Sequence, residues 1–181
     1  MKIATNFFAF ACLAAASSFA ASDQADPKSC PLHAEHMAQA AAQQSSDKGE
    51  AELAARGDRA MGFQQSRSAH HFRLLANGGA IEVTANELAD STTREQIRQH
   101  LAKIAQQFAL GDFSSPLETH AQLPPGVEAM RLLKSKISYQ YQPRAQGGSV
   151  TIASSDAGAV AAIHDFLRFQ IREHRTGDPA E

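Results

Sequence analysis

Four potential metal ligands lie within eight residues near the start of the chain. Cys30, His33, His36 and Met37 supply a thiol, two imidazoles and a thioether. Thiolate and thioether sulfur favour Cu(I), whereas imidazole nitrogen accepts copper or zinc. The Cys-x2-His spacing would let two donors reach one ion from a short turn. The segment therefore predicts capture of copper or zinc, and the alternative is a coincidence of composition.

The rest of the chain contains six further histidines: His70, His71, His100, His120, His164 and His174. Imidazole is the commonest metal ligand in proteins and the side chain that titrates near neutral pH. We expect His70, His100 and His174 to provide a second or shared metal site. The alternative is that they are hydrogen-bonded core residues without a ligand.

The second half of the chain repeats its first. Each copy begins with two glycines and an extended pattern, continues with a helical pattern and ends with Gly-Asp. In the first copy these features lie at 78–83, 97–101 and 111–112, and in the second at 147–152, 163–167 and 177–178. Such self-similarity indicates a duplicated supersecondary unit. Superposing the helical stretches places His174 opposite Phe108 and His100 opposite Phe166, so these histidines occupy positions where the other copy has an aromatic residue.

Each copy is expected to be a β-hairpin followed by a helix. Alternating residues flank Asn77-Gly78-Gly79, and apolar residues from Ile97 to Phe108 recur at helical spacing. Thr92 followed by Glu95 favours a capping box at the start of that helix. We expect an α+β fold: a duplicated ββα unit forms a four-stranded antiparallel sheet with two helices on one face, plus a short connector helix over 127–136.

On the first strand of the predicted hairpin, which runs from His70 to Ala76, the side chains of His70 and His71 would point to opposite faces of the sheet. His70 shares its face with Phe72 and Leu74. We therefore expect His70 to be the buried member of the pair.

The N-terminal residues have the pattern of a secretory signal peptide. Lys2 precedes the apolar run 7–13, and Ser18 and Ala20 are the small residues of a cleavage site near Ala20. We expect a signal peptide at 1–20, a flexible arm at 21–60 and one domain at 61–178. Within this domain the first repeat is 69–112, the connector 113–136 and the second repeat 137–178. The mature protein is expected to be periplasmic or secreted, and no later apolar stretch has the roughly 20 residues of a membrane span.

Composition and missing motifs exclude several function classes. A formal net charge of −2 argues against nucleic acid as a partner. After cleavage Cys30 is the single cysteine, so no intramolecular disulfide can form. The chain has no haem-attachment motif, no nucleotide-binding glycine-rich loop and no nucleophile elbow. An enzyme is therefore not favoured.

One short run resembles an enzyme family. Ser91-Thr92-Thr93-Arg94 looks like the phosphate-binding Ser-Thr-Arg-Thr run of aspartate carbamoyltransferases. Those enzymes need a far longer chain with two α/β domains, and here a helix start explains the same residues. We therefore argue against the transferase activity.

A set of motifs resembles a family of small exported bacterial proteins of unestablished activity, some of which carry the aspartate carbamoyltransferase label. The motifs are Met61-Gly62-Phe63, His70-His71-Phe72, Ile97-Arg98-Gln99-His100-Leu101, Pro124-Pro125-Gly126-Val127 and Ile163-His164-Asp165-Phe166-Leu167-Arg168-Phe169. The Cys-Pro-Leu-His stretch also resembles Cys-Pro-Met-His peptides of exported heavy-metal-handling proteins, with Leu32 in place of the methionine.

Together these features predict a periplasmic, non-catalytic protein that captures or handles copper or zinc. The alternative is a protein-interaction or small-ligand module that uses the open face of the sheet and has structural histidines. Its partner would be a second copy of the chain or another periplasmic protein.

Overall fold

The computed structural model describes residues 31–181, leaving aside the side chains of residues 31–33 and 46. The expected signal peptide and Cys30 lie outside the described residues. The chain divides after Ala42 into two compact units, and the second unit contains the sheet and all helices after α1. The elements are α1 (Pro31–Met61), η2 (Gln65–Arg67), β1 (Ser68–Leu75), β2 (Gly78–Ala85), α2 (Ser91–Leu110), α3 (Ser114–His120), α4 (Val127–Leu132), η3 (Lys134–Lys136), β3 (Ile137–Arg144), β4 (Gly147–Ser154) and α5 (Ala157–His174).

Helix α1 occupies most of the segment that the sequence predicts to be a flexible arm. Its alanines, glutamines and charged residues have high intrinsic helix propensity, which explains a helix without a continuous apolar face. Glu52 lies 4.0 Å from Lys48 and 4.0 Å from Arg56, at the spacing that supports helices. Within the second unit, Arg56 donates a hydrogen bond to the carbonyl of Thr119 at 3.1 Å. None of the described helices is long and apolar enough to cross a membrane.

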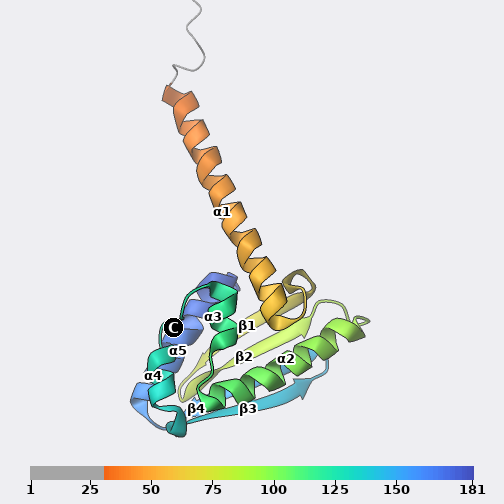
Figure 1. The fold of residues 1–181 in the computed structure, drawn as a ribbon, viewed down its shortest axis with the longest axis vertical. Coiled ribbons are helices and arrows are strands. Elements are labelled where there is room, and N and C mark those ends of the chain that lie inside the picture. Colours follow the sequence, from red (N-terminus) through yellow and green to blue (C-terminus); the bar gives the residue numbers. More distant parts are fainter. Residues whose placement is uncertain (1–30) are drawn as a thin grey trace, which may run out of the picture. The chain divides into compact units, whose positions relative to one another are not determined.

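The four strands form one antiparallel sheet in the order β1-β2-β4-β3 (Figure 1). Strand β3 starts 69 residues after β1, and β4 starts 69 residues after β2. The central pairing keeps this offset, since Gly78 lies opposite Ala153 and Gly147 opposite Thr84. The sheet therefore has an approximate two-fold axis between β2 and β4, and the expected α+β fold with a four-stranded antiparallel sheet is confirmed.

Two equivalent glycines allow the central strands to pair so closely. A Cβ atom at Gly78 would collide with the carbonyl oxygen of Ile152, and one at Gly147 with that of Val83. Only glycine fits where another backbone approaches this closely. The Gly-Gly steps that mark the repeat in the sequence are thus required by the contact between the two copies.

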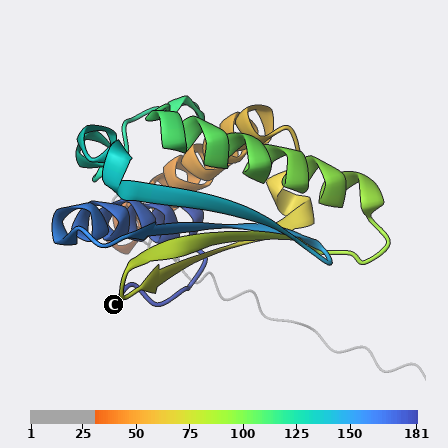
Figure 2. The same ribbon diagram turned by 90° about the horizontal axis from the view of Figure 1, so that it is seen from below.

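Helices α2 and α5 cover the same face of the sheet (Figure 2). Their apolar faces enter one hydrophobic core, where Ile97 and Leu101 of α2 and Ile163 and Leu167 of α5 are fully buried. Hydrophobic burial on this face is the main source of stability for such an arrangement.

Both helices start with an aspartate cap. The backbone N–H of Thr93 donates to Asp90 at 3.0 Å, and that of Ala159 donates to Asp156 at 3.0 Å. The capping box predicted from Thr92 and Glu95 is wrong, because α2 already begins at Ser91 with Asp90 as its cap.

The other face of the sheet carries mainly small and polar residues, with an ion pair between Arg73 and Glu82 at 3.3 Å. The C-terminal residues close part of the free edge of β1 (Figure 2). Asp178 accepts a hydrogen bond from the backbone N–H of Phe72 at 2.9 Å and lies 3.0 Å from Nδ1 of His71. On the opposite edge, β3 contains Pro143, which has no N–H to offer to another strand.

The connector between the two copies contains more helix than expected. The predicted short helix over 127–136 corresponds to α4 followed by η3, and Val127 and Met130 of α4 are fully buried. The sequence analysis does not predict helix α3, which brings His120 into the interior, where the side chain is 1% exposed.

Candidate functional site

The two-fold relation between the copies extends to the helices with a slightly different offset. Residues 86–89 separate β2 from its helix cap, whereas only Ser155 separates β4 from its own. The caps Asp90 and Asp156 are therefore 66 residues apart, and this offset pairs Phe108 with His174. Positions on α2 and α5 can thus be compared directly.

One half of the interior is filled by aromatic rings. Phe108 lies 4.4 Å from Phe113, 5.9 Å from Phe166 and 6.0 Å from Tyr139, measured between ring centroids. Phe108 and Phe166 are at most 2% exposed. These rings, here called the aromatic cluster, come from α2, α5, β3 and the start of α3.

The equivalent half contains histidines at the same positions. His174 corresponds to Phe108, His100 to Phe166 and His70 to Tyr139. The rings of His70 and His174 are stacked 5.3 Å apart at an angle of 11°. His120 of α3 joins them, with its ring 5.1 Å from that of His174.

Phe63 packs against two members of this group. Its ring is 6.0 Å from the ring of His70 and 5.8 Å from that of His100. Gly62 adopts a positive φ of 79°, which ends α1 after Met61 and turns the chain so that Phe63 can enter the interior.

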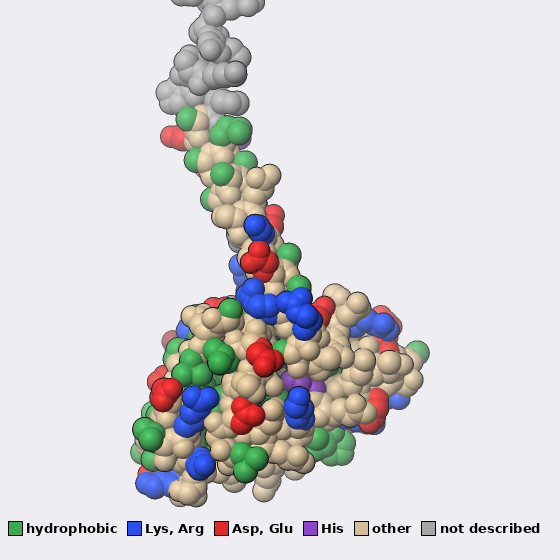
Figure 3. Space-filling model, viewed as in Figure 1, with side chains coloured by type: hydrophobic (Ala, Val, Ile, Leu, Met, Phe, Trp, Pro, Cys, Tyr) green, Lys and Arg blue, Asp and Glu red, His purple; other side chains and the backbone are tan. Residues whose placement is uncertain are grey.

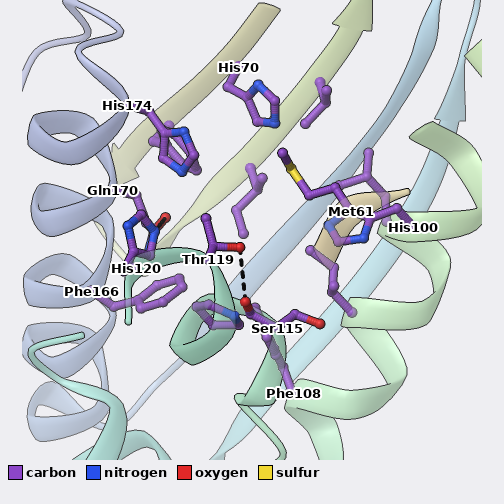
Figure 4. A pocket seen from close by; sticks show the side chains of 16 residues that line it. Met61, His70, His100, Phe108, Ser115, Thr119, His120, Phe166, Gln170 and His174 are labelled. Carbon is purple, nitrogen blue, oxygen red and sulfur yellow. Dashed lines mark hydrogen bonds between the residues drawn. The ribbon is translucent and has the colours of Figure 1, made fainter. Parts of the chain in front are cut away.

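The four histidines line a single pocket with a free volume of about 60 Å³, here called the histidine pocket (Figure 4). Its wall also includes Met61, and the remainder is mostly apolar. One water molecule needs roughly 10–15 Å³ of such space, so the pocket can hold a single ion or a few waters. It is too small for a typical organic substrate, whose pocket measures hundreds of Å³.

Several polar atoms in the pocket wall have no hydrogen-bond partner. Nε2 of His120 is 3.0 Å from the side-chain oxygen of Gln170, so His120 donates there and leaves Nδ1 with a free lone pair. That Nδ1 is 3.9 Å from the carboxylate of Glu173, too far for a hydrogen bond. Nε2 of His70 and Nε2 of Gln170 are likewise buried without a partner. Buried polar groups are rarely left unpaired unless they serve a ligand or a water.

Burial keeps the pocket histidines neutral. Burial, and next the charge of His71, lowers the pKa of His70 to about 4. Burial, and next the charge of His70, lowers the pKa of His100 to about 4 and that of His174 to about 3. The pKa of His120 is also lowered by burial, although Gln170 and Glu173 oppose the shift. Neutral imidazoles each offer one nitrogen lone pair at neutral pH.

The pocket does not contain a ready-made cage for a metal ion. Among the described residues, no group of three or more His, Cys, Asp or Glu side chains is arranged to hold a metal. The nearly parallel rings of His70 and His174 explain part of this, because their lone pairs do not converge on one point. A metal in this pocket would need a smaller imidazole set, a different type of donor, or a turn of one ring.

The structure brings together some of the residues singled out in the sequence. His70, His100 and His174 line the histidine pocket, and His70 is directed inward while His71 lies on the other face, as predicted. In the first unit, His36 and Met37 are exposed on α1. His33 lies in α1, and Cys30 is outside the described residues.

The sequence analysis left His120 and Met61 out of the predicted metal site. His120 lies in the connector, which has no counterpart in the repeat, so comparing the copies could not reveal its position. The run 112–116 carries a signal for α3, because an aspartate just before a helix and a proline in its first turn are typical of a helix start. Asp112 accepts the backbone N–H of Ser114 at 2.9 Å. Met61 falls just before the repeat begins.

Comparison of the chain with protein-family models, with curated proteins and with solved structures found no match.

Proposed function

We propose that this protein is exported and binds a copper or zinc ion, without catalysis, in the histidine pocket. The observation that carries the proposal is the replacement of three aromatic positions by histidine in one half of a symmetric core. Tyr139, Phe166 and Phe108 show what packing alone requires at these positions. Imidazole is the side chain that metal sites use most often.

The histidines are destabilising if packing is their only role. An imidazole buried without a full set of hydrogen bonds costs free energy that a phenylalanine at the same position does not. Nε2 of His70 and Nδ1 of His120 are both buried and unpaired. Proteins usually tolerate such violations at functional sites, where a ligand supplies the missing partner.

The pocket hydroxyl groups do not support a catalytic role. Thr119 donates its hydroxyl to the carbonyl of Ser115 at 3.0 Å, as Figure 4 shows, and Ser115 donates its own to Gln107 at 3.3 Å. Among the described residues, neither hydroxyl is hydrogen-bonded to a pocket histidine. A nucleophile activated by histidine would need such a contact, so the arrangement supports binding.

The donors near the N-terminus belong to a separate part of the proposal. Cys30, His33, His36 and Met37 would form a second capture site that works independently of the histidine pocket. The alternative of a partner bound to the open sheet face stays a prediction, since no observation on that face favours it.

The test compares metal content in two matched variants of the untagged full chain, purified without chelators. The first carries His70→Tyr, His100→Phe and His174→Phe, which copies the aromatic cluster into the histidine pocket. The second carries no pocket substitution. Both variants carry Cys30→Ser, His33→Ala, His36→Ala and Met37→Leu, so that the N-terminal donors contribute no metal to either. After exposure to Cu(I) or Zn(II), elemental analysis should find a pocket-bound ion in the second variant and lose it in the first.

Circular dichroism of the first variant shows whether it is folded. A folded first variant that retains as much metal as the second would contradict the proposal for the pocket. Absence of metal from the wild-type protein after exposure to both ions would contradict it altogether.

A further inference from the structure

We propose that the histidine pocket selects a soft monovalent ion, Cu(I), and that the thioether of Met61 is one of its ligands, together with His70 and His100. This inference rests on the proposed metal-binding function and adds the identity of the ion and a ligand outside the histidine set.

Met61 is placed to act as a ligand. It is the last residue of α1 and lies in the wall of the histidine pocket. Figure 4 shows its side chain reaching into the pocket, with the sulfur between His70 and His100 in this view. The thioether therefore adds a donor of a different type to the imidazoles.

The end of α1 is held in place by several hydrogen bonds. The N–H of Gly62 donates to the carbonyl of Asp58 at 3.0 Å, and the N–H of Gln65 donates to the carboxylate of Asp58 at 2.8 Å. The side chain of Gln65 reaches back to the carbonyl of Ala54 at 3.3 Å. Because these contacts fix the turn after Met61, its thioether is preorganised in the pocket wall.

The charge of the pocket favours a monovalent ion. Among the described residues that line it, none carries a carboxylate or thiolate, so the wall offers no negative charge to balance the charge of an ion. The cost of moving an ion from water into an apolar medium rises with the square of its charge, so the cost for a divalent ion is about four times as large in this environment. Divalent zinc sites usually compensate with charged ligands or a full tetrahedral set.

The number and type of donors point the same way. No described group of three His, Cys, Asp or Glu side chains can enclose an ion, which argues against tetrahedral zinc. Cu(I) accepts two or three ligands and favours sulfur. Nε2 of His70 is buried and unpaired, so it is free to join Met61 and His100 in such a set. His174, stacked on His70, would then support the ring instead of sharing the ion.

An ion can reach this set from the surface. Met61 and His100 also line an outer hollow of about 380 Å³, together with Arg59, Gln99 and Lys103. Figure 3 shows histidine atoms at the protein surface with Lys or Arg side chains nearby. The two basic residues of the hollow repel free cations and favour an ion that arrives in an anionic complex.

The test measures Cu(I) and Zn(II) affinity in the full chain that carries the four N-terminal substitutions, so that only the pocket contributes. Competition with the chelator bicinchoninate under anaerobic conditions gives the Cu(I) affinity. Met61→Leu keeps the volume of the side chain but removes the sulfur. Met130→Leu is the matched control, because Met130 is fully buried in α4 and lies outside the pocket wall.

We expect Met61→Leu to lower Cu(I) affinity roughly tenfold to a hundredfold or more, the range seen when even an outer-shell partner of a metal is lost, while Met130→Leu leaves it unchanged. X-ray absorption of the Cu(I) form should show a sulfur neighbour that disappears in Met61→Leu.

Equal affinities in the two methionine variants, or a pocket that binds Zn(II) more tightly than Cu(I), would overturn this inference and leave metal binding intact. Failure to bind either ion would overturn the proposed function as well.

Discussion

The histidine pocket and the aromatic cluster are two versions of one structural site within a single chain. Both are framed by α2, α5 and an outer strand, and both use the same three positions of the repeat. In one version the rings of Phe108 and Phe166 pack against Phe113. In the other, His174 and His100 stand at the same positions, and the cavity of about 60 Å³ between the two versions is lined by all four of these side chains. The scaffold therefore does not demand histidine, and the difference between the halves is the observation on which the proposed metal binding rests.

The aromatic cluster is itself not free of polar atoms. The hydroxyl of Tyr139 is buried without a partner, and burial raises the pKa of this group. The contrast therefore lies in the number of polar rings. One unpaired hydroxyl is a modest cost, whereas the histidine half brings several imidazoles to the wall of the cavity.

The largest effect on stability is expected when a histidine replaces a phenylalanine of the aromatic cluster. Phe166→His places an imidazole where the side chain is 1% exposed and surrounded by rings. We expect the free energy of unfolding to fall by about 3 kcal/mol, since apolar contacts are lost and the new polar atoms have no partners. Urea unfolding at neutral pH measures this loss.

The reverse change, His100→Phe, is the control for this prediction. It restores the type of ring that the other copy has at this position and partly fills the pocket, so it should not destabilise the protein at neutral pH. If both substitutions lowered the free energy of unfolding by similar amounts, the two halves would tolerate substitution equally poorly. The comparison between them would then not support a special role for the histidines.

A smaller effect is expected from acid. Burial lowers the pKa of His100 to about 4 in the folded protein, whereas the unfolded chain has the ordinary value near 6.5. The unfolded state then binds more protons, so the contribution of His100 is complete above pH 6.5 and is lost as pH falls toward 4. This amounts to about 2 kcal/mol by pH 5.

His100→Phe should remove this part of the pH dependence. Urea unfolding of the wild-type and variant proteins between pH 7.5 and 5 therefore measures the difference directly. Parallel curves for the two proteins would show that His100 titrates normally in the folded state and that the pocket does not shield it.

The sequence predicts the parts of the fold that the duplication repeats. Each Gly-Gly step marks a hairpin in both copies, and aligning the helical pattern of one copy with that of the other is enough to place His174 and His100 at aromatic positions. The connector could not be predicted in this way, because 113–136 has no second copy to compare. Helix α3 and its buried His120 were missed for that reason.

Helix α1, which brings Met61 into the wall of the histidine pocket, could not be predicted from the hydrophobic pattern either. Residues 21–60 lack the apolar periodicity that indicates a packed helix, yet α1 forms from intrinsic propensity and ends at Met61 because Gly62 adopts a positive φ. Periodicity reports packing faces, so it is silent about a helix of which only the C-terminal turns pack against the rest of the second unit. The sequence was also not enough to identify the helix caps. Thr92 and Asp90 are both residue types that cap helices, and only the position at which α2 begins shows that Asp90 is the cap.

The smallest effect concerns the scaffold that the two halves share. Asp90→Ala and Asp156→Ala each remove a cap whose carboxylate accepts one backbone N–H at 3.0 Å. Each aspartate also pairs with one cation at 2.6 Å, Arg67 in the first copy and Lys136 in the second. We expect each variant to lower the melting temperature by roughly 2–4 °C.

Nearly equal decreases in melting temperature in the two cap variants would sharpen the comparison. They would show that the helix starts of the two copies are energetically alike although the side chains in the two halves of the interior differ. Calorimetry at neutral pH gives both melting temperatures. A large loss from one cap and none from the other would show that the copies differ energetically at their helix starts as well. The histidines could then no longer be treated as the main departure from the repeat, since the scaffold of the two copies would have diverged around them.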